Sequence, residues 1–349
     1  MTMTQTNSPR ATKPYALVTA LQQRFVNKLE TVCHAVDDPQ TFESVRWLRD
    51  EGRHGGGSRY GIADSQTFNR ASVNVSQVHY DDDPEKSLGS ATALSTIIHP
   101  QNPHAPSVHM HISWTELKTG KGYWRMMADL NPAIENAEDT AIFVNCLKQV
   151  APKQYEAAAA QGDRYFNIPV LGCHRGVSHF YLEDFHSGDA QADLALAQSL
   201  IESVIDCYTE LLAQALQNNP SPTPKEYEQQ RAYHTLYLFQ VLTLDRGTTS
   251  GLLVHDQNDL GILGSLPGRI DKRLLASWQG TMDTPQDLLL EAILNALPTE
   301  TPCLINDAIK QALADVVRGH YQKYPQAISM QASGDVIPAT VDNHRSLAL

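Results

Sequence analysis

The stretch "STIIHPQNPHAPSVHMHIS", residues 95–113, carries four histidines and three prolines between two short apolar runs. The apolar runs are rich in β-branched residues and the prolines separate them, which predicts a strand, a turn and a second strand. Because side chains alternate across a strand, His109 and His111 are expected on the same face. Four histidines in one hairpin have two interpretations. They are either hydrogen-bonded in a loop or a core, or they form a binding site.

Outward from this hairpin, residues 42–129 form a series of short β-rich runs cut by glycine and proline. Such a series predicts antiparallel strands that follow one another in a meander. The runs are "FESVRWLRD", "SRYGIA", "ASVNVSQVHY", "SATALSTIIH", "SVHMHISWTEL" and "YWRMMADL". Further strands are predicted at 177–185 and in two runs within 235–256.

Helical spacing of apolar residues fills most of the remaining chain. Helices are predicted at 17–36, at 133–165 with a break at Pro152, at 189–219 with Asp189 as N-cap, at 285–297 and at 302–321. Strands early and late with helices between them indicate an α+β fold in a single domain, with an antiparallel β-sheet flanked by helices on both faces. Residues 1–13 are expected to be a flexible leader, 14–323 the domain, and 324–349 a loosely ordered tail.

Charge and composition exclude several classes of protein. A formal net charge of −12 over 349 residues argues against non-specific binding to nucleic acid or to an anionic membrane, since both require a basic face. No apolar run approaches the roughly 20 residues of a membrane span, and the first 15 residues lack the apolar centre of a signal peptide. We therefore expect a cytoplasmic protein. Its five cysteines are widely spaced, which predicts reduced thiols.

The common catalytic and nucleotide-binding motifs are absent from the sequence. There is no GxGxxG after a strand, no GxxxxGK[ST], no HExxH and no GxSxG. The glycine cluster "EGRHGGGSRYG", residues 51–61, is followed by no helix whose N-terminus would bind an anion, so a flexible strand connection is favoured over a phosphate site.

Several blocks in order resemble the oxygen-dependent coproporphyrinogen III oxidases of haem biosynthesis. They are "RWLRDEGRHGGGSR", "ASVNVSQVH", "HPQNPHAPSVH", "ADLNP", "HRGVSHFYLEDF" and "LDRGTTSGL". The resemblance implies a curved antiparallel sheet between helical layers, and a homodimer that uses neither a metal nor an organic cofactor. It also implies an oxidative decarboxylation, with O2 as co-substrate, that converts two propionates of a reduced tetrapyrrole to vinyl groups.

The same resemblance implies which residues form the site. The catalytic set falls on Asp129, Asp245 and Arg246, and the substrate-binding set includes Ser95, His109 and Arg175. By this resemblance Asp129 is the carboxylate that would hold the pyrrole N–H groups and stabilise positive charge on the ring, and arginines would hold propionates. Two structural alternatives stay open: Asp129 as the cap of a following helix, and Asp245 with Arg246 as an ion pair at a turn. His99 and His104 belong to the rigid proline turn, where a structural role is expected.

Departures from the family pattern fall on the expected pocket. Ser113 stands where the family has an arginine, "RMMA" (125–128) replaces a glycine triplet, and Ser178 with His179 replaces two glycines. One interpretation is compensation, with Arg125 supplying the lost cation and His179 adding to the binding site. The other is a relative that uses the same fold on a different carboxylate substrate.

Two further alternatives remain open at this point. One is a metal held by His109, His111 and His179 together with Asp129 or Asp245. The other is a tetrapyrrole-binding protein without turnover.

Overall fold

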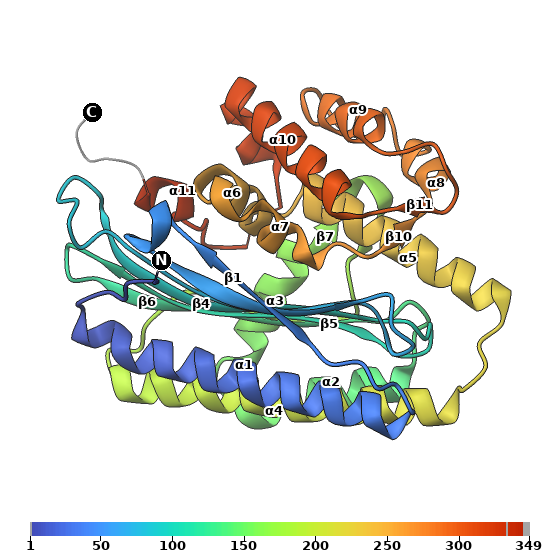
Figure 1. Ribbon diagram of the computed structural model, residues 1–349, viewed down its shortest axis with the longest axis horizontal. Helices are drawn as coiled ribbons and strands as arrows, with labels where there is room; N and C mark the ends of the chain where they lie inside the picture. The colour runs from blue at the N-terminus through green and yellow to red at the C-terminus, as the bar shows by residue number, and fades with distance from the viewer. Residues whose placement is uncertain (1, 333, 345–349) are drawn as a thin grey trace.

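A computed structural model describes residues 2–332 and 334–344. A seven-stranded antiparallel sheet lies between two layers of helices (Figure 1), in the strand order β1-β2-β3-β4-β5-β6-β9. The α+β prediction is therefore confirmed. The strands are β1 (Glu43–Leu48), β2 (Gly55–Ala63), β3 (Phe68–His79), β4 (Leu88–Pro100), β5 (Ser107–Leu117), β6 (Gly122–Asn131) and β9 (Ser178–Phe185).

The histidine-rich stretch forms the hairpin of β4 and β5 at the centre of this sheet. The pairing places Ser95 opposite His111 and Ile97 opposite His109. In the turn, the Asn102 side chain accepts a hydrogen bond from the backbone of His104 at 3.0 Å, as expected of an asparagine that closes its own turn. The predicted strand, turn and strand are confirmed.

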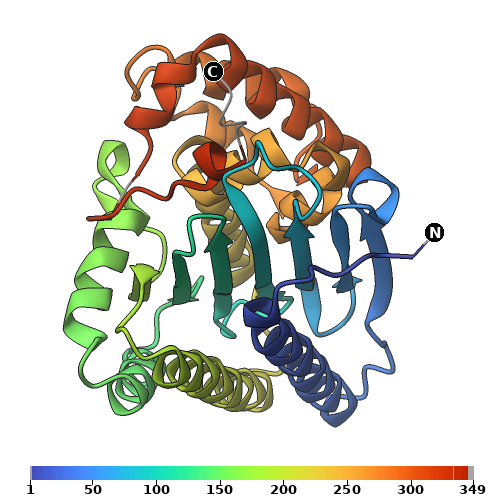
Figure 2. The same ribbon diagram turned by 90° about the vertical axis from the view of Figure 1, so that its left-hand side faces the viewer.

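One face of the sheet packs on α1 (Pro9–Ala35), α2 (Ala137–Val150) and α4 (Ala190–Asn218) (Figure 2). The strand residues that face these helices are apolar and almost fully buried, among them Val108, Met110, Ile112 and Met126. The predicted N-cap of α4 is confirmed, since Asp189 accepts from two backbone N–H groups at 3.0 Å. This layer holds the larger hydrophobic core.

The second layer covers the opposite face. It contains α5 (Pro224–Thr243), α6 (Arg246–Val254), α7 (Asp259–Ile262), α8 (Lys272–Ala276), α9 (Gln286–Ala296) and α10 (Asp307–Lys323), with two short ribbons, β10 (Arg269–Ile270) with β11 (Cys303–Leu304) and β7 (Asn167–Ile168) with β8 (Cys173–His174). The helices of this layer share a core of their own.

The predicted strands within 235–256 are wrong, because this segment forms the end of α5 and all of α6. The second half of α5 is buried on every side, including Leu238, Phe239, Val241 and Leu242. A helix that is apolar all round loses the 3.6-residue periodicity that identifies a surface helix, so its short apolar runs resemble strands.

The chain ends also differ from the sequence prediction. The first helix begins at Pro9, eight residues before its predicted start, with Ser8 as N-cap. Proline is favoured in the first turn, where its missing N–H has no partner to lose. The segment predicted as a tail contains η5 (Pro325–Met330) and α11 (Thr340–Asn343), while residues 333 and 345–349 of that prediction lie outside the described residues.

The cysteine prediction is confirmed, since all five are free thiols. Within residues 2–332 and 334–344, the structure has no helix with both the length and the apolar character needed to span a membrane.

The helix α3 (Tyr155–Phe166) packs closely against β9 at the edge of the sheet, and glycine permits this approach. A Cβ at Gly162 would lie 2.6 Å from the Cβ of His179. A Cβ at Gly319, inside α10, would meet no heavy atom within 4 Å. The two helical glycines therefore serve as a matched pair.

We predict that Gly162→Ala destabilises the protein by about 1–3 kcal/mol through overpacking. In contrast, Gly319→Ala should stabilise it by about 0.5–1 kcal/mol, because alanine restricts the unfolded chain and favours the helix. Urea denaturation of both variants measures these changes. Equal effects of the two substitutions would contradict the close packing of α3 on β9.

Candidate functional site

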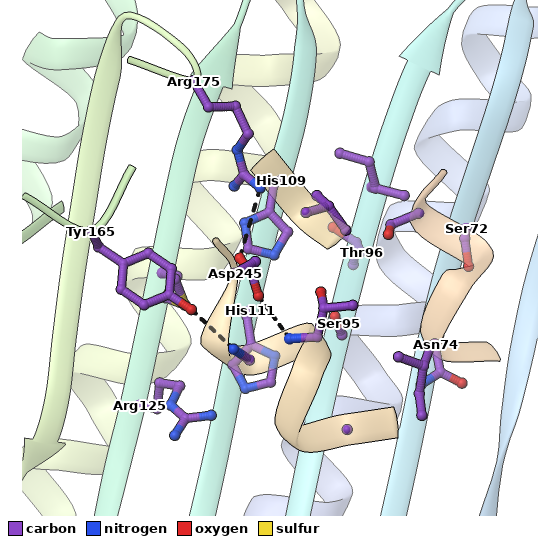
Figure 3. Close-up of a pocket in the computed structure, with 18 of the residues that line it drawn as sticks. Ser72, Asn74, Ser95, Thr96, His109, His111, Arg125, Tyr165, Arg175 and Asp245 are labelled. Atoms are coloured by element: carbon purple, nitrogen blue, oxygen red, sulfur yellow. Dashed lines mark hydrogen bonds and ion pairs between the residues drawn. The ribbon is translucent and has the colours of Figure 1, made fainter. Parts of the chain in front are cut away.

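A cavity of about 180 Å³ lies between the sheet and the second helical layer. Strand register supplies its floor: Asn74, Ser95, His111, Met127 and Tyr181 face one another across five strands. In Figure 3, His109 and His111 stand on the same strand with Asp245 near them, and Ser95, Asn74 and Ser72 follow on the neighbouring strands. The prediction that both histidines share one face is confirmed.

His109 is held by a buried carboxylate. Its Nδ1 lies 2.6 Å from Oδ1 of Asp129, which is directly opposite on β6. The other oxygen of Asp129 accepts from Arg175 at 3.0 Å and from the Asn131 amide at 2.7 Å. Asp129 has no exposed surface and does not line the cavity, so it reaches the site through His109 and Arg175.

The charges of this network stabilise one another. Burial alone would raise the pKa of the Asp129 carboxyl, but Arg175, His109 and Asn131 together hold that pKa below its ordinary value. Burial would likewise lower the pKa of Arg175, but the charge of Asp129 raises it. Asp129 is therefore a carboxylate that can only accept hydrogen bonds.

This ionisation fixes the proton on His109. Because a carboxylate can only accept, Nδ1 of the imidazole must carry the hydrogen. Nε2 is then the ring nitrogen that remains for a ligand, and it has no hydrogen-bond partner among the residues that the structure describes. An imidazole oriented by a carboxylate in this way can accept a proton from a bound molecule.

Arg175 connects this network to a second carboxylate. Its guanidinium lies between the rings of Phe166 and Tyr237, at 4.2 and 5.0 Å from their centroids, and donates to Gln240 at 2.9 Å. Oδ2 of Asp245 is 3.9 Å from Arg175. Together with the ion pair to Asp129, these contacts hold a cation that is almost fully buried.

Asp245 faces the cavity from the start of α6. Its Oδ1 accepts from the backbone of Thr248 at 2.7 Å and thereby caps the helix. Arg246 does not line the cavity, since its side chain donates to the carbonyl of Ile328 at 2.8 Å. The two residues form no turn ion pair with each other.

Arg125 lines the cavity but already has a counter-ion. It forms an ion pair with Glu183 and also donates to Thr340 at 3.3 Å. Although burial would lower the pKa of Arg125, Glu183 raises it. That Arg125 replaces the arginine lost at Ser113 as a propionate anchor stays a prediction. A propionate bound there would have to share Arg125 with Glu183.

His111 is the second imidazole of the floor. Its Nε2 lies 3.1 Å from the Ser113 hydroxyl. Burial, with added repulsion from Arg125 and His109, lowers its pKa well below the ordinary value of histidine. The ring is therefore neutral at pH 7.

The structure does not bring together the three histidines of the metal alternative, because the side chain of His179 is bonded elsewhere. Its Nδ1 bonds Asp163 and its Nε2 bonds the Arg175 carbonyl, both at 2.7 Å. Across residues 2–332 and 334–344, no group of three or more His, Cys, Asp or Glu side chains is placed to hold a metal ion. The same contacts keep His179 out of the cavity, where it was predicted to bind substrate.

The structure thus brings five of the predicted residues to the cavity: Ser95, His109, Arg125, Arg175 and Asp245. It places Asp129, Arg246 and His179 behind it. Sequence analysis missed Tyr165, whose hydroxyl accepts from the Gly247 backbone at 3.1 Å, and Tyr181 with Glu183, joined at 2.6 Å. Tyr181 and Glu183 follow His179 at intervals of two residues along β9, so all three share one face of the strand. This spacing was the signal in the sequence that could have identified them.

Comparison with known proteins gives one consistent result. The profile of the family described as Coproporphyrinogen III oxidase matches residues 14–297. The mitochondrial oxygen-dependent coproporphyrinogen-III oxidase of Rattus norvegicus is 28% identical over 313 residues, which cover 82% of this chain and 68% of that protein. The Homo sapiens enzyme is 28% identical over 308 residues (80% and 65%). The Drosophila melanogaster enzyme is 28% identical over 275 residues (72% and 69%). The chain spans about two thirds of the length of each relative.

The buried ion pair generates a test of stability against pH. Because the folded-state pKa of Asp129 is lowered, its contribution to stability is present above the unfolded pKa of about 4 and is lost as pH falls through the folded value. We predict that Arg175→Met costs about 3–5 kcal/mol at pH 7, since it leaves a buried charge unpaired.

In the Arg175→Met variant, burial raises the pKa of Asp129, so protonation of Asp129 removes the unpaired charge. The deficit in unfolding free energy relative to wild type should therefore shrink between pH 7 and pH 5. Urea unfolding at both pH values measures the deficit. Arg164→Met removes an exposed ion pair with Asp335 and should cost less than about 1 kcal/mol at either pH. A deficit for Arg175→Met that does not change with pH would contradict the buried carboxylate.

Proposed function

The chain belongs to the coproporphyrinogen III oxidase family, and on that premise we propose that it catalyses the oxidative decarboxylation of propionate side chains on a reduced tetrapyrrole. Coproporphyrinogen III is the proposed substrate and O2 the proposed electron acceptor. The observation that carries the proposal is the imidazole of His109, which is held by a buried carboxylate and presents its free nitrogen to a cavity that also contains Asp245.

The reaction balances without a further co-reactant. A propionate loses CO2 and a hydride equivalent from the carbon next to the ring, and a vinyl group remains. The two electrons and one proton pass to O2, which takes a second proton from solution and becomes hydrogen peroxide. The protein must hold the ring, exchange protons with it and stabilise the positive charge that develops as electrons leave.

Each of these tasks has a residue suited to it. His109 exchanges a proton with the pyrrole through Nε2, and Asp129 acts on it as a positioning residue. Asp245 is the carboxylate that faces the ring, where it accepts from pyrrole N–H groups and stabilises positive charge. This assigns the ring contact to Asp245, whereas the sequence prediction gave it to Asp129.

A homodimer with no metal or organic cofactor is proposed from the family resemblance alone. A cytoplasmic location is proposed from the composition of the sequence, not from the relatives, of which two are mitochondrial. Localisation and sedimentation measurements address these statements independently of the site.

One observation favours a second candidate function. The cavity of about 180 Å³ is smaller than the roughly 300–1,000 Å³ of most pockets for drug-sized ligands, and a tetrapyrrole is larger than those ligands. Met127, Tyr181 and the pair of Arg125 with Glu183 occupy one end of it. The alternative is the same decarboxylation on a smaller carboxylate-bearing pyrrole.

The test is aerobic and anaerobic incubation of the protein with coproporphyrinogen III, with release of CO2 and formation of vinyl products as readouts. We predict turnover in air and none without O2. Substitution of the proposed proton-transfer group, His109→Gln, should lower kcat by about 10²–10⁴-fold.

The matched control is His104→Gln. This histidine comes from the same hairpin, but it lies in the surface turn and pairs with Glu226 at 3.0 Å, so it should retain wild-type kcat. Binding of coproporphyrinogen III without any vinyl product would reject the enzymatic proposal in favour of a tetrapyrrole-binding protein. Turnover of a smaller pyrrole carboxylate in its place would select the second candidate.

A further inference from the structure

A second cavity, of about 310 Å³, opens on the same side of the sheet as the first. It lies over the edge formed by β1, β2 and β3, beside the N-terminus of α10. Three cations line it: Arg59 from β2, Arg70 from β3 and Lys310 from α10. We call it the cationic cavity, and the first the substrate cavity.

The three cations have few partners of their own. Arg59 makes no hydrogen bond or ion pair among the residues that the structure describes. Arg70 donates through Nη2 to the carbonyl of Ile305 at 3.2 Å, while its buried Nε has no partner. Lys310 is 4% exposed and pairs with Asp307 at 3.1 Å.

The local charge favours an anion. Asp307, whose side chain is 70% exposed, and the exposed Glu43 are the carboxylates in the lining. Lys310 also stands in the first turn of α10, where the helix dipole is positive and a cation is unfavourable. Burial lowers the pKa of Arg59, of Arg70 and of Lys310, as expected for charges that are incompletely compensated.

The two cavities adjoin through Ser72, which lines both. Arg59 is opposite Asn74 in the β2–β3 pair, and Asn74 is opposite Ser95, so Arg59 shares the sheet face that carries His111. Gly264 lies at this boundary, and a Cβ there would be 3.2 Å from the Ser72 hydroxyl and 3.6 Å from Cδ of Arg59, so a side chain would narrow the space between the cavities. The cations therefore lie next to the substrate cavity and on the same face of the sheet.

We propose that the cationic cavity is a carboxylate-binding site that receives the acid side chains of the molecule whose reacting group lies in the substrate cavity. This inference rests on the proposed function for the identity of that molecule. Guanidinium groups match carboxylates in geometry, and a tetrapyrrole with several propionates supplies acid groups far enough apart to reach both cavities. It also explains how a small substrate cavity serves a large substrate.

The test compares Arg59→Gln and Lys310→Met with Arg46→Gln. Arg59 has no hydrogen bond to lose among the described residues and only a longer-range attraction to Asp307, so its substitution should leave the fold intact, which thermal unfolding checks. Arg46 is exposed on β1, and its substitution removes the same charge outside both cavities. KM and kcat for coproporphyrinogen III are measured for each protein, together with the change in Tm on adding inorganic phosphate as a small anion.

We expect Arg59→Gln to raise KM by roughly 10- to 100-fold, the loss for one charged hydrogen bond, and by more than it lowers kcat. Lys310→Met should act in the same direction, and Arg46→Gln should change neither constant. Phosphate should raise the Tm of wild type and of Arg46→Gln, and this rise should be absent from Arg59→Gln.

The results separate this inference from the proposed function. Turnover by wild type with KM unaltered in Arg59→Gln and Lys310→Met overturns the carboxylate site and leaves the function standing. If phosphate binds through Arg59 in that case, the cavity holds a free anion and the inference is still overturned. If wild type has no turnover, the proposed function fails. In that case a phosphate-induced rise in Tm that requires Arg59 supports the anion site. The absence of such a rise overturns the anion site as well.

Discussion

The ion pair of Arg175 with Asp129 is the interaction on which the rest of the site depends. Both side chains are almost fully buried, and each would be costly alone. Together they keep a carboxylate ionised beneath the floor of the substrate cavity. That carboxylate orients His109, and the same arginine also pairs with Asp245 at the start of α6. One pair therefore fixes groups from the sheet and from the second helical layer.

This arrangement gives different roles to Asp129 and Asp245, which the family resemblance had placed together in one catalytic set. Asp129 and Asp245 are both acidic residues of family-like blocks, yet one is behind the cavity and the other faces it. The first determines the proton position on an imidazole, and the second offers negative charge to the ligand. The departure at Arg125, which pairs with Glu183, affects the size and charge of the cavity without touching Asp129.

The parts of this account that follow local patterns were predictable from sequence. Alternation along β5 placed His109 and His111 together, and the cap at Asp189 located the start of α4. The buried half of α5 was not predictable, because burial on all sides removes the helical period. The partners of Asp129 were also out of reach, since Arg175 is 46 residues away and meets it only when β6 pairs with β9. Pairing between distant segments decides which side-chain atoms of a charged residue remain free to bind a ligand. A local sequence pattern contains no information about that pairing.

The most direct test of the central claim is the tautomer of His109, measured by ¹⁵N NMR on protein labelled at histidine, with His109→Gln to assign its signals. The neutral ring is expected to carry its hydrogen on Nδ1 and to leave Nε2 unprotonated, because Asp129 accepts from Nδ1. Asp129→Asn should remove this preference. A neutral ring protonated on Nε2, or a tautomer that does not respond to Asp129→Asn, would contradict the role given to the buried pair.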